Sequence, residues 1–116
     1  MQYAILFYET AADFAQRNDP KKGPEYWGAW GAYIETLTKS GIVRGGAGLQ
    51  PPTTGTTVRL RAGQRQVQDG PFADTKEQLG GFFLVDLETE TDALALAAEI
   101  PGARGGTIEV RAVTQY

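Results

Sequence analysis

The chain has 116 residues, the length of one domain, and we expect a single domain over residues 1–116. Its composition is 41% hydrophobic and 22% charged, which is ordinary for a globular protein and excludes intrinsic disorder. There is no cysteine and no histidine, so disulfides, thiolate nucleophiles, Ser-His-Asp triads and imidazole-bound zinc or haem are excluded. The formal net charge of −3 argues against nucleic acid or a membrane surface as a partner.

The first residues predict a strand and no targeting segment. Met1 leads into an apolar run at residues 3–8 without a basic stretch, and the run is far shorter than the ~20 residues of a membrane span. We therefore expect a cytoplasmic protein. Because residues 3–8 are apolar at every position, this strand is expected to be buried on both faces. The polar stretch at residues 11–24 predicts a loop, with one helical turn at 11–15.

Residues 25–40 predict a long helix. Pro24 suits its first turn and Gly41 suits its C-terminal cap. Four large side chains recur at helical spacing: Tyr26, Trp30, Tyr33 and Leu37. Such a stripe is typical of a core or a subunit interface, and the alternative is that Trp30 and Tyr33 form the apolar wall of a ligand site.

The middle of the chain predicts an irregular strand and a hairpin. Residues 42–49 read as a strand whose glycines imply a bulge or a close backbone approach. Residues 57–61 and 65–68 flank Ala62-Gly63-Gln64, which is typical of a β-hairpin. The hairpin carries Arg59, Arg61 and Arg65 in a stretch without acidic residues. These arginines form a solvated face, or they meet an anionic ligand or an acidic partner.

The last third predicts a second half similar to the first. The expected elements are a helical turn at 73–79, a strand at 82–87 opened by Gly80-Gly81, a helix from Thr89 or Thr91 to Ile100 that Pro101-Gly102 ends, and a strand at 106–113. The order β-α-β-(hairpin)-β-α-β is that of the ferredoxin-like α+β fold, with two helices on one face of an antiparallel sheet. The other sheet face is also apolar, so we expect a homodimer that covers it.

Residues 69–82, Asp-Gly-Pro-Phe-Ala-Asp-Thr-Lys-Glu-Gln-Leu-Gly-Gly-Phe, resemble the signature of the DGPF proteins in the YCII-related family. Shorter similar words lie at residues 30–33, 45–52, 100–101 and 108–111, so the resemblance spans nearly the whole chain. It implies a ferredoxin-like dimeric α/β-barrel of a bacterial family often encoded beside extracytoplasmic-function sigma factors and related to muconolactone-isomerase-like enzymes. The YciI branch carries a proposed His–Asp pair, of which only Asp69 has a counterpart here.

Candidate site residues come from the strand ends and the last strand. Asp69 precedes Gly70-Pro71, where it either accepts backbone N–H groups of the turn or acts as a general base in a cleft. Glu109 and Arg111 alternate with apolar residues that should face the helices, so both are expected in the dimer barrel. They form an internal ion pair, or Arg111 holds the carboxylate of a small organic anion. Lys76 is a candidate lid residue, with Gly80-Gly81 as its hinge.

Two functions follow from these residues. The first is a metal-independent enzyme of the isomerase or lyase type that acts on a small organic anion in the dimer-barrel cleft, with Asp69 as base and with Arg111, Glu109, Trp30, Tyr33 and Lys76 binding the substrate. No metal or cofactor is expected, because no clustered carboxylate motif such as Asp-x-Asp occurs. The alternative is a non-catalytic ligand-binding or regulatory module that associates with an extracytoplasmic-function sigma factor.

Overall fold

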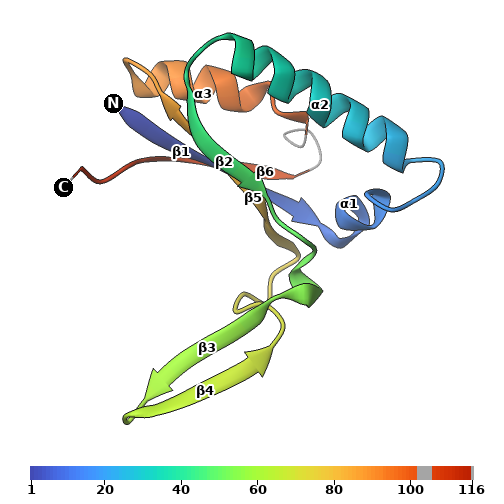
Figure 1. The fold of residues 1–116 in the computed structure, drawn as a ribbon, viewed down its shortest axis with the longest axis vertical. Coiled ribbons are helices and arrows are strands. Elements are labelled where there is room, and N and C mark those ends of the chain that lie inside the picture. Colours follow the sequence, from blue (N-terminus) through green and yellow to red (C-terminus); the bar gives the residue numbers. More distant parts are fainter. Residues whose placement is uncertain (102–105, 116) are drawn as a thin grey trace.

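The computed structural model describes residues 1–101 and 106–115 and has the expected ferredoxin-like α+β fold (Figure 1). Four antiparallel strands form the main sheet in the order β2-β5-β1-β6, and α2 and α3 cover one of its faces. In chain order the elements are β1 (Gln2–Thr10), α1 (Ala11–Gln16), α2 (Gly23–Lys39), β2 (Val43–Gly48), the short 3-10 helix η1 (Pro52–Thr54), β3 (Thr56–Arg61), β4 (Gln64–Asp69), β5 (Glu77–Asp86), α3 (Glu90–Ala98) and β6 (Thr107–Ala112). In this described part, no helix is long and apolar enough to cross a membrane.

The core lies between the sheet and the two long helices. Along β1, Tyr3, Ile5 and Phe7 are buried against the helices, and the side chains between them on the opposite face are only partly buried. The expectation that β1 is buried on both faces therefore holds for the helix face alone in a single chain. On β6, Ile108 and Val110 pack against the core as expected from the alternation of that strand.

Local signals at the helix ends are confirmed. Pro24 lies in the first turn of α2, and Gly41 follows that helix with φ +78, a conformation that favours glycine. The Thr10 side chain caps α1 and exchanges hydrogen bonds with Asp13, a capping box, so the predicted helical turn is formed. The Thr89 hydroxyl accepts from the Asp92 amide and caps α3. Gly102, expected to end this helix with Pro101, lies outside the described residues.

The helical turn predicted at residues 73–79 is wrong. Strand β5 begins at Glu77 and runs through Gly80 and Gly81, so these glycines are part of a strand and do not form the hinge expected beside Lys76. A Cβ at Gly81 would lie 2.2 Å from the Phe7 ring and 2.6 Å from the Ala47 carbonyl oxygen. The two glycines therefore let neighbouring groups approach the strand closely, and a helix-like turn would remove its pairing with β1.

The predicted hairpin forms a separate two-stranded sheet, β3 with β4. Ala62 and Gly63 make its two-residue turn, with φ values of 50 and 77, the positive pair that a type I′ turn requires. In Figure 1 the hairpin leaves the main sheet on the side opposite to the helices. This hairpin, residues 56–69, therefore projects from the rest of the domain, and we call it the arm.

We expect Gly28→Ala and Gly31→Ala each to raise the free energy of unfolding by about 0.5–1 kcal/mol, because both glycines cost helix entropy in the middle of α2. A Cβ built at either position meets no atom within 4 Å. Chemical denaturation of the single variants measures the change. Gly46→Ala is the opposite control: at φ +151 its Cβ would lie 2.6 Å from the Phe82 carbonyl oxygen, so stability should fall.

Candidate functional site

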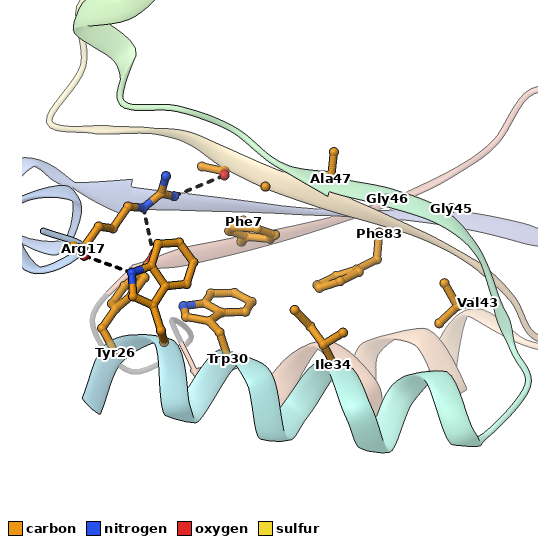
Figure 2. Close-up of a pocket in the computed structure, with 13 residues that line it drawn as sticks. Phe7, Arg17, Tyr26, Trp30, Ile34, Val43, Gly45, Gly46, Ala47 and Phe83 are labelled. Atoms are coloured by element: carbon orange, nitrogen blue, oxygen red, sulfur yellow. Dashed lines mark hydrogen bonds between the residues drawn. The ribbon is translucent and has the colours of Figure 1, made fainter. Parts of the chain in front are cut away.

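A pocket of about 360 Å³ lies between α2 and the edge strand β2 (Figure 2). Trp30 and Ile34 approach it from the helix, and Phe7 and Phe83 approach it from the sheet. Trp30 stacks at a tilt on Phe7, with ring centroids 4.6 Å apart, and its own side chain is only 5% exposed. The walls of the pocket are therefore largely aromatic and fixed by core packing.

The pocket exists because β2 presents glycines to the helix. Gly46 pairs with Phe83 and Gly48 pairs with Gly81, positions on the helix-facing side of the sheet, so no side chain fills the space there. The register is irregular between Val43 and Gly45, which confirms the bulge expected in this strand. Gly46 also approaches the backbone of β5 so closely that any side chain would collide with it.

Arg17, just after α1, closes one end of this pocket. Its Nη2 donates to Glu9 Oε1 at 2.9 Å and to the Gly80 carbonyl oxygen at 3.3 Å. Its Nη1 donates to the Leu49 carbonyl oxygen, and its Nε donates to the Tyr26 hydroxyl at 3.2 Å. The guanidinium also lies over three aromatic rings, those of Phe14, Tyr26 and Trp27, at 4.8, 5.9 and 5.6 Å from their centroids. The cation is thus held by carbonyls, a carboxylate and π-faces at once.

Glu9 is the buried partner of this cation. It continues the helix-facing alternation of β1 and its side chain is 2% exposed, against 8% for Arg17. The Tyr26 hydroxyl donates to Glu9 Oε2 at 2.7 Å, so each carboxylate oxygen has a donor. A Cβ at Gly80 would lie 2.4 Å from Glu9 Oε1, so only glycine leaves room for the carboxylate. We call Glu9, Arg17 and Tyr26 the buried triad.

The electrostatics of the buried triad keep Tyr26 protonated. Burial, followed by the hydrogen bond to Glu9, raises the pKa of Tyr26 to about 12. At neutral pH its phenol is therefore neutral and is a hydrogen-bond donor. Burial by itself disfavours the charge on Arg17, but the hydrogen bonds to Tyr26 and Glu9 outweigh it and raise the pKa of the guanidinium. The pocket consequently ends in a permanent positive charge.

The residues singled out from the sequence are spread over different parts of the chain. Trp30 lines the pocket, whereas Tyr33 lies beside it on α2 and donates from its hydroxyl to the Leu96 carbonyl oxygen at 3.1 Å. Asp69 is exposed at the end of β4 on the arm. Lys76 is exposed beside a second hollow that Glu9, Phe14 and Thr75 also line.

Glu109 and Arg111 lie on the sheet face away from the helices. Arg111 Nε is 3.9 Å from Glu109 Oε2, and the Tyr8 hydroxyl donates to Glu109 Oε1 at 3.2 Å. The ion pair considered from the sequence is thus formed, with side chains 72% and 46% exposed in the single chain. Because the sheet separates them from Trp30, one chain does not bring Arg111 and Trp30 to a common cavity.

The sequence reasoning missed Glu9 and Arg17. A signal for Glu9 was present: it follows Tyr3, Ile5 and Phe7 at a spacing of two, so an acid stood in register with the buried face. A carboxylate on that face needs a buried cation, and Arg17 is the nearest basic residue along the chain.

The sheet order, the two helices on one face and the hairpin insertion define a ferredoxin-like α+β protein. Residues 1–116 match the YCII-related domain, and the chain belongs to the YCII-related family. An uncharacterized protein from Rhizobium meliloti (strain 1021) is 34% identical over 121 residues, covering 100% of this chain and 94% of that protein.

A solved structure shares the fold. It is the 5-chloro-2-hydroxyhydroquinone dehydrochlorinase TftG from Burkholderia phenoliruptrix AC1100, in complex with 2,5-dihydroxybenzoquinone. The TM-score is 0.58 at 15% sequence identity, with 100% of this chain and 96% of that chain covered. At this identity the likeness concerns the fold alone.

We expect Glu9→Gln to lower the free energy of unfolding by about 3 kcal/mol, because it leaves the Arg17 cation buried without its counter-charge. Glu88→Gln is the matched control: Glu88 is exposed, so the same change there should stay within about 0.5 kcal/mol. Urea unfolding of both variants provides the comparison. Equal effects in the two variants would contradict a structural role for the buried triad.

The free energy of unfolding should depend on pH in the alkaline range because of two tyrosines, Tyr26 and Tyr33. The pKa of Tyr33 is raised from 10.0 to about 12, by burial first and then by the charge of Glu99, and that of Tyr26 is similarly raised. Below pH 10 their contribution to stability is complete. As the pH rises toward 12 it is lost, because the tyrosines of the unfolded chain ionise first.

Tyr33→Phe should therefore lose less stability than the wild type between pH 10 and pH 12. Unfolding curves at stepped pH, with tyrosinate absorbance followed in parallel, provide the measurement. A stability difference that stays constant across this range, or five tyrosines titrating together near pH 10, would contradict it.

Proposed function

We propose that the chain is a metal-independent enzyme of the isomerase or lyase type, and that its substrate is a small, flat organic anion bound between α2 and β2. The observation that carries the proposal is the Arg17 guanidinium at the end of an aromatic pocket. The proposed site differs from the one expected from Asp69 and Arg111, because Arg17, Tyr26 and Trp30 line one pocket, with Glu9 behind Arg17 and Tyr26.

The pocket favours a flat ring with an acidic oxygen. The rings of Phe7 and Phe83 and the glycine backbone of β2 line the sheet side, and Trp30 and Ile34 line the helix side. A space between these two apolar layers suits a thin, apolar body. Four N–H groups of Arg17 are used in the contacts among the described residues, which leaves one Nη1 hydrogen for a ligand oxygen. A charge-assisted hydrogen bond at the end of this largely apolar pocket would fix the orientation of the anion.

The buried triad supplies an acid–base route. The Tyr26 oxygen accepts a proton from a carbon of the ligand while its own proton passes to Glu9 Oε2, 2.7 Å away. The ligand thereby loses one proton and Glu9 gains it, and the negative charge that develops on the ligand oxygen faces Arg17. Loss of a leaving group or return of the proton at another carbon completes a lyase or isomerase step. The quinone-bound dehydrochlorinase of the same fold supports a ligand of this shape and acidity.

We also propose that the chain is a homodimer through the sheet face opposite to the helices. Ala4 pairs with Leu84 and Leu6 pairs with Phe82, so four apolar side chains lie together on that face. They are only partly buried in the single chain, and a second sheet would cover them. In such a dimer Glu109 and Arg111 would lie within the interface.

The alternative is a non-catalytic ligand-binding or regulatory module, with an extracytoplasmic-function sigma factor as its partner. It would use the same pocket without turnover. The observation that favours this alternative is the basic, exposed arm, because its arginines have no acidic partner among the described residues and could meet an acidic protein surface. Proton exchange in the bound ligand separates this module from an enzyme.

The pocket can be tested by filling it. A Cβ at Gly48 meets no atom within 4 Å, so Gly48→Val should fold normally and occupy the space meant for the ligand. We expect its affinity for 2,5-dihydroxybenzoquinone and for small ring carboxylates to fall at least about tenfold, or about 1.4 kcal/mol. Both tryptophans of the chain line the pocket, so quenching of their fluorescence reports binding. Gly28→Ala, on the exposed side of α2, is the matched control.

The second part of this experiment tests whether the protein catalyses proton transfer. Wild-type protein should wash deuterium from solvent into a carbon-bound position of a binding compound, followed by NMR, and Tyr26→Phe should slow this exchange by about 100-fold while binding persists. If compounds bind and Gly48→Val blocks them but no carbon exchanges, the binding module is the correct function. If none of the compounds quenches the wild type, the pocket assignment fails.

A further inference from the structure

The arm, residues 56–69, stands apart from the domain that it belongs to. The radius of gyration of the chain is 15.9 Å, against about 13 Å for a compact chain of this length. The hydrogen bonds at its base, Gly70 N to the Gly55 carbonyl oxygen and Thr57 Oγ1 to the Gly70 carbonyl oxygen, close the hairpin on itself. Among the described residues, no side chain of the arm forms a hydrogen bond or ion pair with the main sheet or the helices.

One face of the arm carries an uncovered apolar patch. Val58 pairs with Val67, and Leu60 lies next to them on the same face, with exposed fractions of 61%, 57% and 68%. The opposite face carries the polar pairs, Arg59 with Gln66 and Arg61 with Gln64. Arg65, opposite Leu60, and Asp69, opposite Thr56, flank the three apolar side chains on their face. Exposed apolar side chains gathered on one face of a strand pair are typical of a surface that another element covers. A two-stranded hairpin in water is only marginally stable, so the arm needs something to pack its apolar face against.

We propose that the occupant is a second copy of this chain, and that each subunit of a dimer packs the Val58–Leu60–Val67 face of its arm on the other. The arm leaves the sheet on the side of the same open apolar face (Figure 1). The corner between them is a hollow of about 520 Å³, lined among others by Tyr8, Leu79 and the 76% exposed Phe72. The open sheet face and this hollow therefore both lie near the base of the arm, where the Arg59 guanidinium covers the Phe72 ring at 5.2 Å from its centroid.

Charge and area agree with a second copy. The arm carries three arginines and one aspartate in a chain whose net charge is −3, so the arm is basic and the rest of the chain is acidic. The opposite net charges favour the approach of the arm of one copy to the body of another. A stable interface buries about 800 Å² per partner, and arms added to the four-stranded sheet face enlarge the area that two-fold symmetry can bury.

The experiment adds one negative charge to either face of the arm in the full chain. Val67→Glu alters the apolar face, and Gln66→Glu is its matched control on the polar face of the same strand. Both positions are exposed in the single chain, so both variants should fold. We expect Val67→Glu to raise the dimer dissociation constant at least about tenfold and Gln66→Glu to change it less than about twofold, by sedimentation analysis over a range of concentrations. Hydrogen exchange of residues 56–69 should be slow in the wild-type dimer and fast in Val67→Glu.

Four results would overturn the proposal. A dimer that Val67→Glu leaves intact would rest on the sheet face alone. A dimer weakened equally by both variants would show that charge, and not the apolar face, matters. Fast exchange of the arm in the wild-type dimer would show that it is not covered. A chain that stays monomeric would leave the arm to a different partner. None of these results depends on ligand binding, so the pocket is tested separately.

Discussion

The buried ion pair between Glu9 and Arg17 is the constraint on which the arrangement of this protein depends. Arg17 contacts β1 through Glu9, the end of β2 through Leu49, β5 through Gly80 and α2 through Tyr26. Four separate segments are thus held at one point. Two charges this deeply buried are tolerated because both Glu9 oxygens and four of the five Arg17 N–H groups have hydrogen-bond partners. The same contacts that stabilise the fold place a cation at the end of the pocket.

The sheet divides the molecule into two regions of different character. On the helix side, aromatic packing and the glycines of β2 create a small, largely apolar pocket beside a fixed charge. On the other side lies an open sheet face with apolar side chains, and Tyr8, Glu109 and Arg111 form its polar part. The pocket and the open sheet face therefore lie on separate surfaces of the molecule.

Most of the fold could be predicted from the sequence because its signals are local. The apolar stripe from Tyr26 to Leu37 predicts α2, and the Ala62-Gly63 turn predicts the hairpin of the arm. The predictions that failed concern features that depend on contacts between residues distant in sequence. Residues 77–79 read as a turn because the glycines that follow look like a strand start, whereas their pairing with Tyr8, Glu9 and Thr10 makes them strand. The buried triad was missed for a related reason: Glu9 and Tyr26 are 17 residues apart, and only the fold reveals that they touch.

The sheet order also determines when the protein can fold. Strand β1 pairs with β5 and β6, and β2 pairs with β5, so no ladder of the main sheet can close before the chain has reached Glu77. During synthesis only the helices and the arm can form from local contacts. Strand β1, with Ile5 and Phe7, therefore has no strand to pair with while two thirds of the chain is made. Contacts between residues distant in sequence consequently govern the folding rate.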